Sequence, residues 1–274
     1  MHATLDQIVA ATRRKVADGK QSVDTRQLER RAEMHVPRGF RRALELRSQT
    51  GPAVIAELKK ASPSRGVIRS DFDPGGLAME LESAGAAALS VLTDQEFFQG
   101  SLENLRIASE STQLPCLRKD FMVDEFQILE ARANRADAIL LIVAALSPAE
   151  LTHLAQRAAE YDLDVLCEAH DEEEVQRAVD CGCNLIGVNS RDLRTLKVDL
   201  ETAFRLVERI PASALRVAES GIKNGVDVAR LQAAGYGAFL IGESLMKVES
   251  PGGALQVLLA EAEGKSCSSL RTGN

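Results

Sequence analysis

The sequence contains no tryptophan, and aromatic residues occupy only 4% of its 274 positions. The hydrophobic core must therefore be mostly aliphatic, since hydrophobic residues still make up 45% of the chain. Aliphatic, β-branched strands are typical of parallel sheets that are buried on both faces. This composition is ordinary for a globular protein and is sufficient for a sizeable core.

No apolar run is long enough to span a bilayer, and the first twenty residues lack the apolar segment of a signal peptide. We therefore expect a cytoplasmic protein without a membrane partner. Basic residues are also in the minority, because 33 Lys and Arg face 40 Asp and Glu, which gives a net charge of −7. An acidic balance argues against nucleic acid as a partner. Any phosphate-bearing ligand must then be held by a local site.

Cysteine is scarce, with five residues and no Cys-x-x-Cys pair. We expect reduced thiols and no disulfide framework. Cys181 and Cys183 flank one glycine, which is only weak evidence for a metal site, and no metal is predicted. Cys116 and Cys167 lie within apolar runs and are interpreted as small core residues.

From Pro52 onward, short apolar runs alternate with longer segments in which apolar residues recur at helical spacing. Ser147-Pro148 and Asp171 are start signals for helices, and Gly235 is typical of a helix end. Eight strand-then-helix units predict an α/β fold, a (β/α)8 TIM barrel with right-handed crossovers and no exposed edge. The alternative, a doubly wound open sheet, would carry a glycine-rich fingerprint after its first strand, where this sequence has ELKKASPSRG. The apolar runs are 53–58, 87–92, 115–118, 136–143, 164–167, 184–188, 215–218 and 238–241.

We predict one barrel domain over residues 1–263, including an N-terminal helical extension over residues 1–50. Leu5 and Ile8 belong to an amphipathic helical pattern in this extension. That helix either plugs the bottom of the barrel or covers the ligand as a lid, and the spacing does not decide between them. Residues 264–274 are small and polar, and we expect them to form a flexible C-terminal tail.

Charged residues stand where several apolar runs end, and the strand ends of a barrel form its active-site face. Glu57 and Lys59 are two residues apart and so face the same side of a strand. Lys119, Glu168 and Glu219 occupy the ends of three other runs. Because such charges are costly to bury unless they pair, we expect them to converge on one cavity suited to acid–base chemistry. The alternative is a purely structural ring of ion pairs.

Small residues follow the last two runs. Ser220-Gly221 and Gly242-Glu243 stand where helices are expected to begin. Their backbone N–H groups are then free to bind an anion, and the helix dipole favours negative charge. Barrels often bind phosphate at these two loops. The sequence therefore predicts a phosphate site there.

Histidine is rare, with four residues in the chain. Only His170 lies near a strand end. Glu168 already fills the inward position two residues earlier, so we interpret His170 as solvent-exposed and uninvolved.

At these residues the sequence resembles the indole-3-glycerol phosphate synthase family. The resemblance is carried by VIAELKKASPSRGVIRSDFDP, VLTDQEFFQGS, LRKDF, NSRDL, ESGI and LIGESLM, which with their spacing extend over most of the chain. It implies a carboxy-lyase of tryptophan biosynthesis that acts on 1-(2-carboxyphenylamino)-1-deoxyribulose 5-phosphate. Ring closure, decarboxylation and dehydration would give indole-3-glycerol phosphate. The resemblance implies no cofactor and no metal.

The resemblance also implies catalytic roles for residues at the strand ends. Lys119 would protonate the ketone oxygen as the aromatic carbon attacks, and its ammonium would stabilise the developing alkoxide. Glu57 and Glu168 would remove protons during dehydration. Lys59 would bind the phosphate or act as a second acid, and these roles cannot be separated from the sequence. Asn189 would orient the substrate and the acid–base groups.

Further residues are implied to bind the substrate. Arg191 would pair with the substrate carboxylate in a fork geometry, and Glu219 would help to orient the reacting groups. Glu243 would use its backbone N–H, with its side chain pointing away from the anion. The phosphate would be held by Lys59, Ser220, Gly221, Gly242 and Glu243. The other residues implied to contact substrate are Ser62, Phe98, Phe121, Leu140, Leu141 and Leu193.

Two other functions are weighed against this one. Phosphoribosylanthranilate isomerase, another phosphate-sugar barrel, would need an Asp and Cys acid–base pair at strand ends. A catalytically inactive barrel that binds a phosphate ligand or a protein would not need the intact Lys119 and Glu168. Some relatives carry a substrate-contacting aromatic residue in the first helix, where this chain offers Ile8. We expect a monofunctional enzyme for a small phosphorylated substrate, acting as a monomer or a weak dimer.

Overall fold

A closed parallel barrel forms the centre of the computed structural model, which describes residues 4–193 and 195–265. Its strands are β1 (Ala53–Leu58), β4 (Ala88–Leu92), β5 (Cys116–Lys119), β6 (Ala138–Ile142), β7 (Asp164–Ala169), β8 (Leu185–Asn189), β9 (Leu215–Glu219) and β10 (Ala238–Ile241). They follow the order β1-β10-β9-β8-β7-β6-β5-β4, with β4 closing back onto β1. The predicted (β/α)8 barrel is confirmed, and the open sheet is excluded. A short hairpin of β2 (Ala61–Ser62) and β3 (Gly66–Val67), which was not predicted, follows β1.

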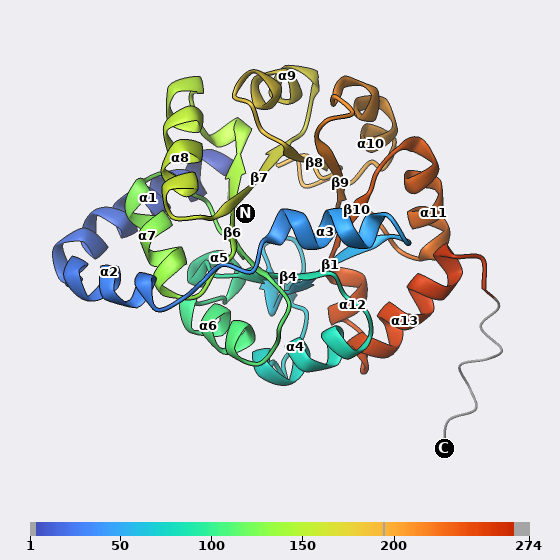
Figure 1. Ribbon diagram of the computed structural model, residues 1–274, viewed down its shortest axis with the longest axis horizontal. Coiled ribbons are helices and arrows are strands. Elements are labelled where there is room, and N and C mark those ends of the chain that lie inside the picture. The colour runs from blue at the N-terminus through green and yellow to red at the C-terminus, as the bar shows by residue number, and fades with distance from the viewer. Residues whose placement is uncertain (1–3, 194, 266–274) are drawn as a thin grey trace.

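Helices surround the barrel, as Figure 1 shows. Three of them, α1 (Leu5–Ser22), α2 (Thr25–Glu33) and α3 (Phe40–Ser48), precede β1. The expected start signals are used: Ser147 forms a capping box with Glu150, and Asp171 accepts a hydrogen bond from the Glu174 N–H. Gly235 ends its helix with a φ of 112°. The others are α4 (Pro74–Ser83), α5 (Gln95–Phe98), α6 (Leu102–Glu110), α7 (Glu125–Ala133), η1 (Val143–Ala145), α8 (Pro148–Glu160), α9 (Glu172–Asp180), α10 (Glu201–Leu206), η2 (Val207–Arg209), α11 (Gly225–Ala234), α12 (Glu243–Met246) and α13 (Pro251–Ala262).

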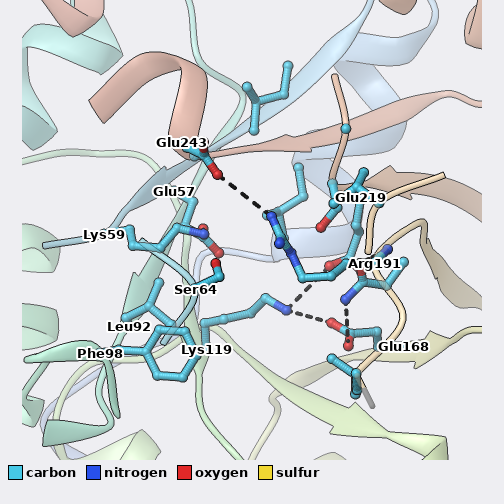
Figure 2. Close-up of a pocket in the computed structure, with 18 of the residues that line it drawn as sticks. Glu57, Lys59, Ser64, Leu92, Phe98, Lys119, Glu168, Arg191, Glu219 and Glu243 are labelled. Atoms are coloured by element: carbon cyan, nitrogen blue, oxygen red, sulfur yellow. Dashed lines mark hydrogen bonds and ion pairs between the residues drawn. The ribbon is translucent and has the colours of Figure 1, made fainter. Parts of the chain in front are cut away.

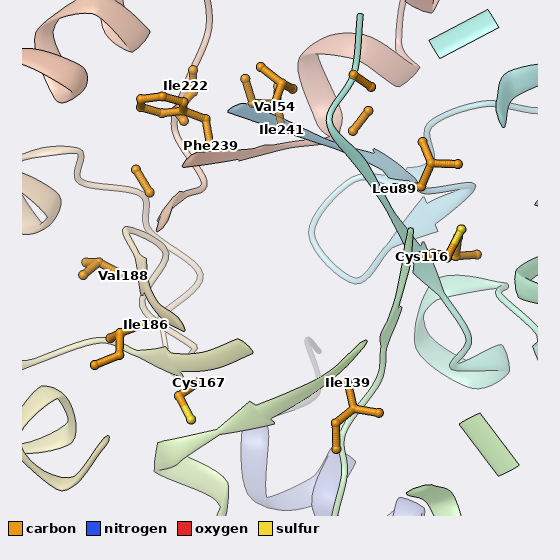
Figure 3. Packing of buried hydrophobic residues seen from close by; sticks show 14 of the residues in the cluster. Val54, Leu89, Cys116, Ile139, Cys167, Ile186, Val188, Ile222, Phe239 and Ile241 are labelled. Atoms are coloured by element: carbon orange, nitrogen blue, oxygen red, sulfur yellow. The ribbon is translucent and has the colours of Figure 1, made fainter. Parts of the chain in front are cut away.

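The core has two layers because side chains alternate along each strand. One set fills the barrel interior and includes Ile55, Leu166 and Leu240. The other set faces the helices and includes Ile139 and Ile186 (Figure 3). Several strands extend past their apolar runs to include a charged or polar residue. That residue then continues the inward-facing alternation and points into the mouth of the barrel.

Helix α3 closes the bottom of the barrel. Phe40 and Leu44 are fully buried in the interior layer with Ala53 and Ala238, which are the first residues of β1 and β10. Figure 1 shows α3 lying across this opening. The loop before α3 is held by Arg38, whose Nη2 lies 2.6 Å from Oδ2 of the fully buried Asp137. This part of the extension is therefore a plug.

Helix α1 lies at the opposite end, beside the loops that follow β5 and β6. Lys20 forms an ion pair of 2.8 Å with Asp124, the N-cap residue of α7. Arg13 forms one of 2.9 Å with Glu150 in the first turn of α8. Ile8 is buried in the interior layer, which also includes Phe121. The plug is thus formed by α3 and not by the first helix, because residues 23–39 carry the chain from the top of the barrel to its bottom.

The cysteines differ from the expectation of reduced thiols. Cys167 of β7 and Cys183, two residues before β8, form a disulfide. Cys116 is a free, buried thiol, and Cys181 is also free. Cys116 and Cys167 are both fully buried in the core, as predicted, but the disulfide corrects the expectation that every thiol is reduced. Sequence spacing could not reveal it, because the chain passes through the whole of α9 before the two residues meet.

The predicted tail over residues 264–274 lies, from residue 266 onward, outside the described residues. Within the described ranges, no helix is both long and apolar enough to cross a bilayer.

Candidate active site

A cavity of about 580 Å³ opens at the carboxyl ends of the barrel strands. This volume lies within the usual range for small-molecule sites. Every barrel strand contributes to its lining, and Figure 2 shows ten of these residues by name. The residues at the strand ends are Glu57, Leu92, Lys119, Ile142, Glu168, Asn189, Glu219 and Ile241.

Lys119 lies between two buried carboxylates at the centre of the cavity. Its Nζ is 2.6 Å from Oε2 of Glu168 and 3.3 Å from Oε2 of Glu219 (Figure 2). Both glutamates are only 1% exposed. Burial opposes a charge on Lys119, but the Glu168, Glu219 and Glu57 carboxylates outweigh it and raise the lysine pKa. Lys119 is therefore an ammonium at neutral pH, with a proton to donate.

The two carboxylates beside Lys119 have different charge states. Burial favours the neutral form of Glu168, but Lys119 and His170 outweigh it and hold the Glu168 pKa well below 4.5. For Glu219, burial and repulsion by Glu168 dominate over the attraction of Lys119 and raise the pKa to about 8. Two acids with opposed environments next to one lysine are the arrangement expected of an acid–base site.

Asn189 ties Glu168 to the loop after β8. Its Nδ2 donates to Glu168 Oε1 at 3.0 Å, and its Oδ1 accepts from the backbone N–H of Arg191 at 3.0 Å. The side-chain amide thus fixes one carboxylate oxygen and the start of the following loop together. The predicted positioning role of Asn189 is compatible with these contacts.

Glu57 and Lys59 form an ion pair on the opposite wall of the cavity. Glu57 is 3% exposed, whereas the Lys59 side chain retains 19% exposure. Glycine at position 242 leaves room for this pair, because a Cβ there would lie 2.4 Å from Glu57 Oε1.

Gly187 likewise leaves room for the Glu219 side chain, since a Cβ at position 187 would lie 2.1 Å from Glu219 Oε1. The sequence reading missed Gly187, whose role depends on the side chain of another strand.

The Glu243 side chain lines the cavity and pairs with two arginines. Its carboxylate lies 3.6 Å from Arg191 Nη2 and 3.3 Å from Arg65 Nε. Figure 2 shows the contact with Arg191 across the mouth of the pocket. Two guanidinium groups hold the side chain in place, so only the backbone of Glu243 fits the phosphate prediction. Arg65, which sequence reading also missed, is brought here by the β2–β3 hairpin.

An apolar wall covers one side of the cavity. The rings of Phe98 and Phe121 lie 6.3 Å apart at a tilt of 36°, and Leu140 and Leu193 line the same cavity. Leu141 does not. It belongs to the outer layer of the core, because neighbouring residues of β6 point to opposite faces.

Ser62 is also absent from the lining and lies in the hairpin strand β2, with its Oγ 3.5 Å from Ser64 Oγ. Ser64 lines the cavity instead. The chain reverses in the hairpin, so spacing along β1 does not extend to Ser62.

The loops after β9 and β10 lie together at one end of the cavity. Ser220 and Gly221 both have left-handed backbone, with φ values of 64° and 82°. Gly242, Lys223 and Lys247 line the cavity beside them. Successive residues in such conformations form concave arrangements of N–H groups that suit anions.

His170 contradicts its interpretation as an exposed, uninvolved residue. Its side chain is only 13% exposed, and Nε2 lies 3.4 Å from Glu168 Oε1. The two-residue spacing from Glu168 is the sequence signal for this contact, because it puts both side chains on one face of the strand.

Within residues 4–193 and 195–265, no group of three or more His, Cys, Asp or Glu side chains is arranged to hold a metal ion. Several charged groups of the cavity instead form lysine–carboxylate and arginine–carboxylate pairs. These groups can donate a proton from Lys119, accept one at Glu168, and bind an anionic ligand at the loops after β9 and β10.

Comparison with solved structures shows the fold. Thiamine phosphate pyrophosphorylase from Pyrococcus furiosus is 18% identical, with a TM-score of 0.59, covering 80% of this chain and 98% of that one. A 3-hexulose-6-phosphate synthase is 12% identical, with a TM-score of 0.61, covering 76% of this chain and 98% of that one. These likenesses concern the barrel alone.

Comparison by sequence is more specific. The family model for indole-3-glycerol phosphate synthase matches residues 5–258. The indole-3-glycerol phosphate synthase of Koribacter versatilis is 58% identical over 94% of this chain and 100% of its own length. That of Acidithiobacillus ferrooxidans is 48% identical over 93% of this chain and 97% of its own. With a lysine held between two carboxylates at the mouth of its barrel, this chain belongs to the indole-3-glycerol phosphate synthase family.

Proposed function

We propose that this chain converts 1-(2-carboxyphenylamino)-1-deoxyribulose 5-phosphate into indole-3-glycerol phosphate, carbon dioxide and water. The aromatic carbon that bears the carboxylate attacks the ketone carbon. Loss of carbon dioxide and loss of the resulting hydroxyl as water then restore the aromatic system. No electrons are exchanged with a second reactant, so the reaction needs only proton donors, proton acceptors and binding groups.

Lys119 supplies the proton to the ketone oxygen in this proposal. The position of its ammonium between Glu168 and Glu219 is the observation that supports the proposal most strongly. A positive charge at this point also stabilises the alkoxide that develops during attack. Glu168, held as a carboxylate, accepts a proton during dehydration. Glu57 and Lys59 act on the other wall, as a second carboxylate and as a phosphate or acid group.

The remaining residues bind the substrate. Arg191 would exchange its contact with Glu243 for the substrate carboxylate. The aromatic ring would lie against Phe98 and Phe121, whose apolar surface disfavours a solvated carboxylate. The phosphate would lie against the left-handed turn at Ser220 and Gly221, near the backbone of Gly242 and Glu243.

Replacement of the central lysine tests this function. Lys119→Ala is expected to lower kcat about a thousandfold, since it removes both the acid and the charge that stabilises the alkoxide. Product formation is measured by indole fluorescence from the anilino-ribulose phosphate. The control is Lys265→Ala, because the Lys265 side chain is 72% exposed beyond the last helix.

Turnover by Lys119→Ala within tenfold of the wild type would contradict the assignment. The alternative isomerase activity is tested by supplying phosphoribosylanthranilate. The isomerised product would appear only if the chain were that isomerase. A chain that binds phosphate but transforms neither compound would be the inactive barrel.

We also propose that residues 1–263 form one domain that works in the cytoplasm as a monomer or a weak dimer. The interior packing of Phe40 and Leu44 supports including the extension in that domain. Light scattering on the purified protein tests the oligomeric state.

A further inference from the structure

His170 contacts the central carboxylate of Glu168 at Oε1, whereas Lys119 contacts it at Oε2. It follows β7, and its ring stands between Glu168 of that strand and Glu174 of α9. Nδ1 is 2.9 Å from Glu174 Oε2, and Nε2 is 3.4 Å from Glu168 Oε1. The ring therefore has a carboxylate on each of its two nitrogens.

Glu174 fixes the orientation of this ring. Its Oε2 accepts both the backbone N–H of His170, at 2.8 Å, and the contact from Nδ1. The Glu174 side chain is only 14% exposed, so these contacts are largely shielded from water. With Nδ1 at Glu174, Nε2 lies at ion-pair distance from Glu168 Oε1 and makes no hydrogen bond among the described residues.

A neutral imidazole fits this position poorly, because one of its nitrogens would turn a lone pair toward a carboxylate. Burial lowers the His170 pKa, but the nearby carboxylates of Glu168 and Glu174 outweigh burial and raise it to about 10. The ring is thus a cation at neutral pH. The other charged groups around Glu168 are Lys119 from β5 and Glu219 from β9.

The proposed reaction gives this cation a specific use. When Lys119 passes its proton to the ketone oxygen, it loses the charge that pairs with Glu168. Glu168 is 1% exposed, and a buried carboxylate without a cation would take up a proton. His170 is the second cation in contact with Glu168 within the part of the chain that the structure describes.

We propose that His170 is a positioning residue for this reaction: its imidazolium, anchored by Glu174, keeps Glu168 a fixed carboxylate while Lys119 donates its proton. The inference rests on the proposed function. His170 does not touch the substrate, and it acts only through Glu168. Lys119 then delivers its proton to the substrate rather than to its neighbour.

The test is the pH profile of His170→Gln, in which the side-chain amide can still donate to Glu174 but carries no charge. We expect the acid limb of kcat to move up by about one pH unit, because an opposite charge at this distance typically lowers a carboxyl pKa by one to three units. On this acid limb, kcat should be about tenfold lower than that of the wild type at the same pH, with KM within about twofold. Activity should recover at pH values above the shifted limb, where Glu168 ionises without help. A purely structural role would lower kcat equally at every pH, and that result would overturn the proposal.

Two further variants complete the experiment. His153→Gln is the matched control, because His153 is 58% exposed and lies 3.4 Å from Glu125 on the surface; its profile should not move. Glu174→Gln keeps the imidazole but removes the charge of its anchor, so the acid limb should move in the same direction by a smaller amount. If His170→Gln does not fold, the profile of Glu174→Gln decides, and an unshifted acid limb there overturns the proposal.

Nitrogen NMR of the wild-type histidines gives a readout that does not depend on turnover. Both ring nitrogens of His170, assigned by their loss in His170→Gln or their shift in Glu174→Gln, should carry protons at pH 8. A ring that is neutral at pH 7 overturns the inference whatever the enzyme does. A wild-type chain that forms no product defeats the proposed function instead, while the NMR result stands by itself.

Discussion

Glu168 and Glu219 are the same residue type, only a few ångströms from the same ammonium, yet they hold different charges. Glu168 contacts Lys119 at 2.6 Å and His170 at 3.4 Å, and Asn189 donates to it. Glu219 contacts Lys119 at 3.3 Å, and its Oε1 has no hydrogen-bond partner among the described residues. Because each cation favours the ionised form and burial opposes it, Glu168 is a base and Glu219 retains its proton.

A single glycine tests the phosphate site at the residue scale. Gly221→Asp should raise KM at least tenfold with a smaller effect on kcat, because the added carboxylate repels the phosphate. Gly221→Ala is the matched control, since it meets the same φ of 82° and the same contact of 2.9 Å with Val198, but adds no charge. Steady-state kinetics of both variants provide the measurement. Equal KM values for the two would place the phosphate elsewhere.

At the scale of elements, helices α1 and α3 of the N-terminal extension pack against opposite ends of the barrel. Helix α3 fills the bottom with Phe40 and Leu44, whereas α1 pairs with the first turns of α7 and α8 near the mouth. The interior layer above α3 separates it from the charged residues. Changes in α3 should therefore affect stability without changing the chemistry.

Phe40→Ala is expected to lower the free energy of unfolding by about 3–5 kcal/mol, because it leaves a cavity beneath the barrel. The kcat of the folded enzyme should stay within about twofold of the wild type. Leu46→Ala on the same helix is the control, since Leu46 is 56% exposed and its loss should cost less than about 0.5 kcal/mol. Urea denaturation and turnover are both measured. A large loss of kcat in Phe40→Ala at full folding would show that α3 also shapes the site.

At the scale of the whole molecule, the buried acids at the mouth of the barrel make the free energy of unfolding depend on pH. Glu219 has its pKa raised from 4.5 to about 8, so the folded protein keeps a proton that the unfolded chain releases between these values. Stability therefore falls as pH rises through this window. Glu168, with its pKa below 4.5, contributes a constant amount over the same range.

Removal of this titration should flatten the pH dependence of stability. Glu219→Gln has no carboxyl to titrate at this position. Between pH 5 and pH 8, the free energy of unfolding of the wild type should therefore fall by on the order of 1–3 kcal/mol relative to that of the variant. The His170 contribution, which is lost as pH rises toward 10, is present in both proteins and largely cancels. Urea titrations at the two pH values measure the difference. A difference that does not change with pH would mean that Glu219 is ionised throughout.

Much of the cavity was predictable because a strand has a period of two and a barrel directs its strand ends to one mouth. Glu57, Lys119, Glu168, Asn189 and Glu219 followed from that rule. The same period of two shows why Leu141 does not line the cavity: its neighbour Leu140 faces the barrel interior, so Leu141 faces the helices. Ser62 was misjudged for another reason, since the chain reverses in the β2–β3 hairpin and Ser64 lines the cavity instead. The contacts of the Glu243 side chain could not be predicted, because they come from Arg65 and Arg191 in distant segments.

The amino-acid sequence by itself determined the eight units, their helix caps, the inward-facing charges and the family, since each depends on residues near one another in the chain. Only the tertiary structure decided which carboxylate holds a proton, that Arg65 and Arg191 meet at Glu243, that Gly187 makes room for Glu219, and that Cys167 meets Cys183. These features arise between strands that the closure of the barrel brings together. Burial and the distance between charges set them, and neither quantity exists until the chain has folded.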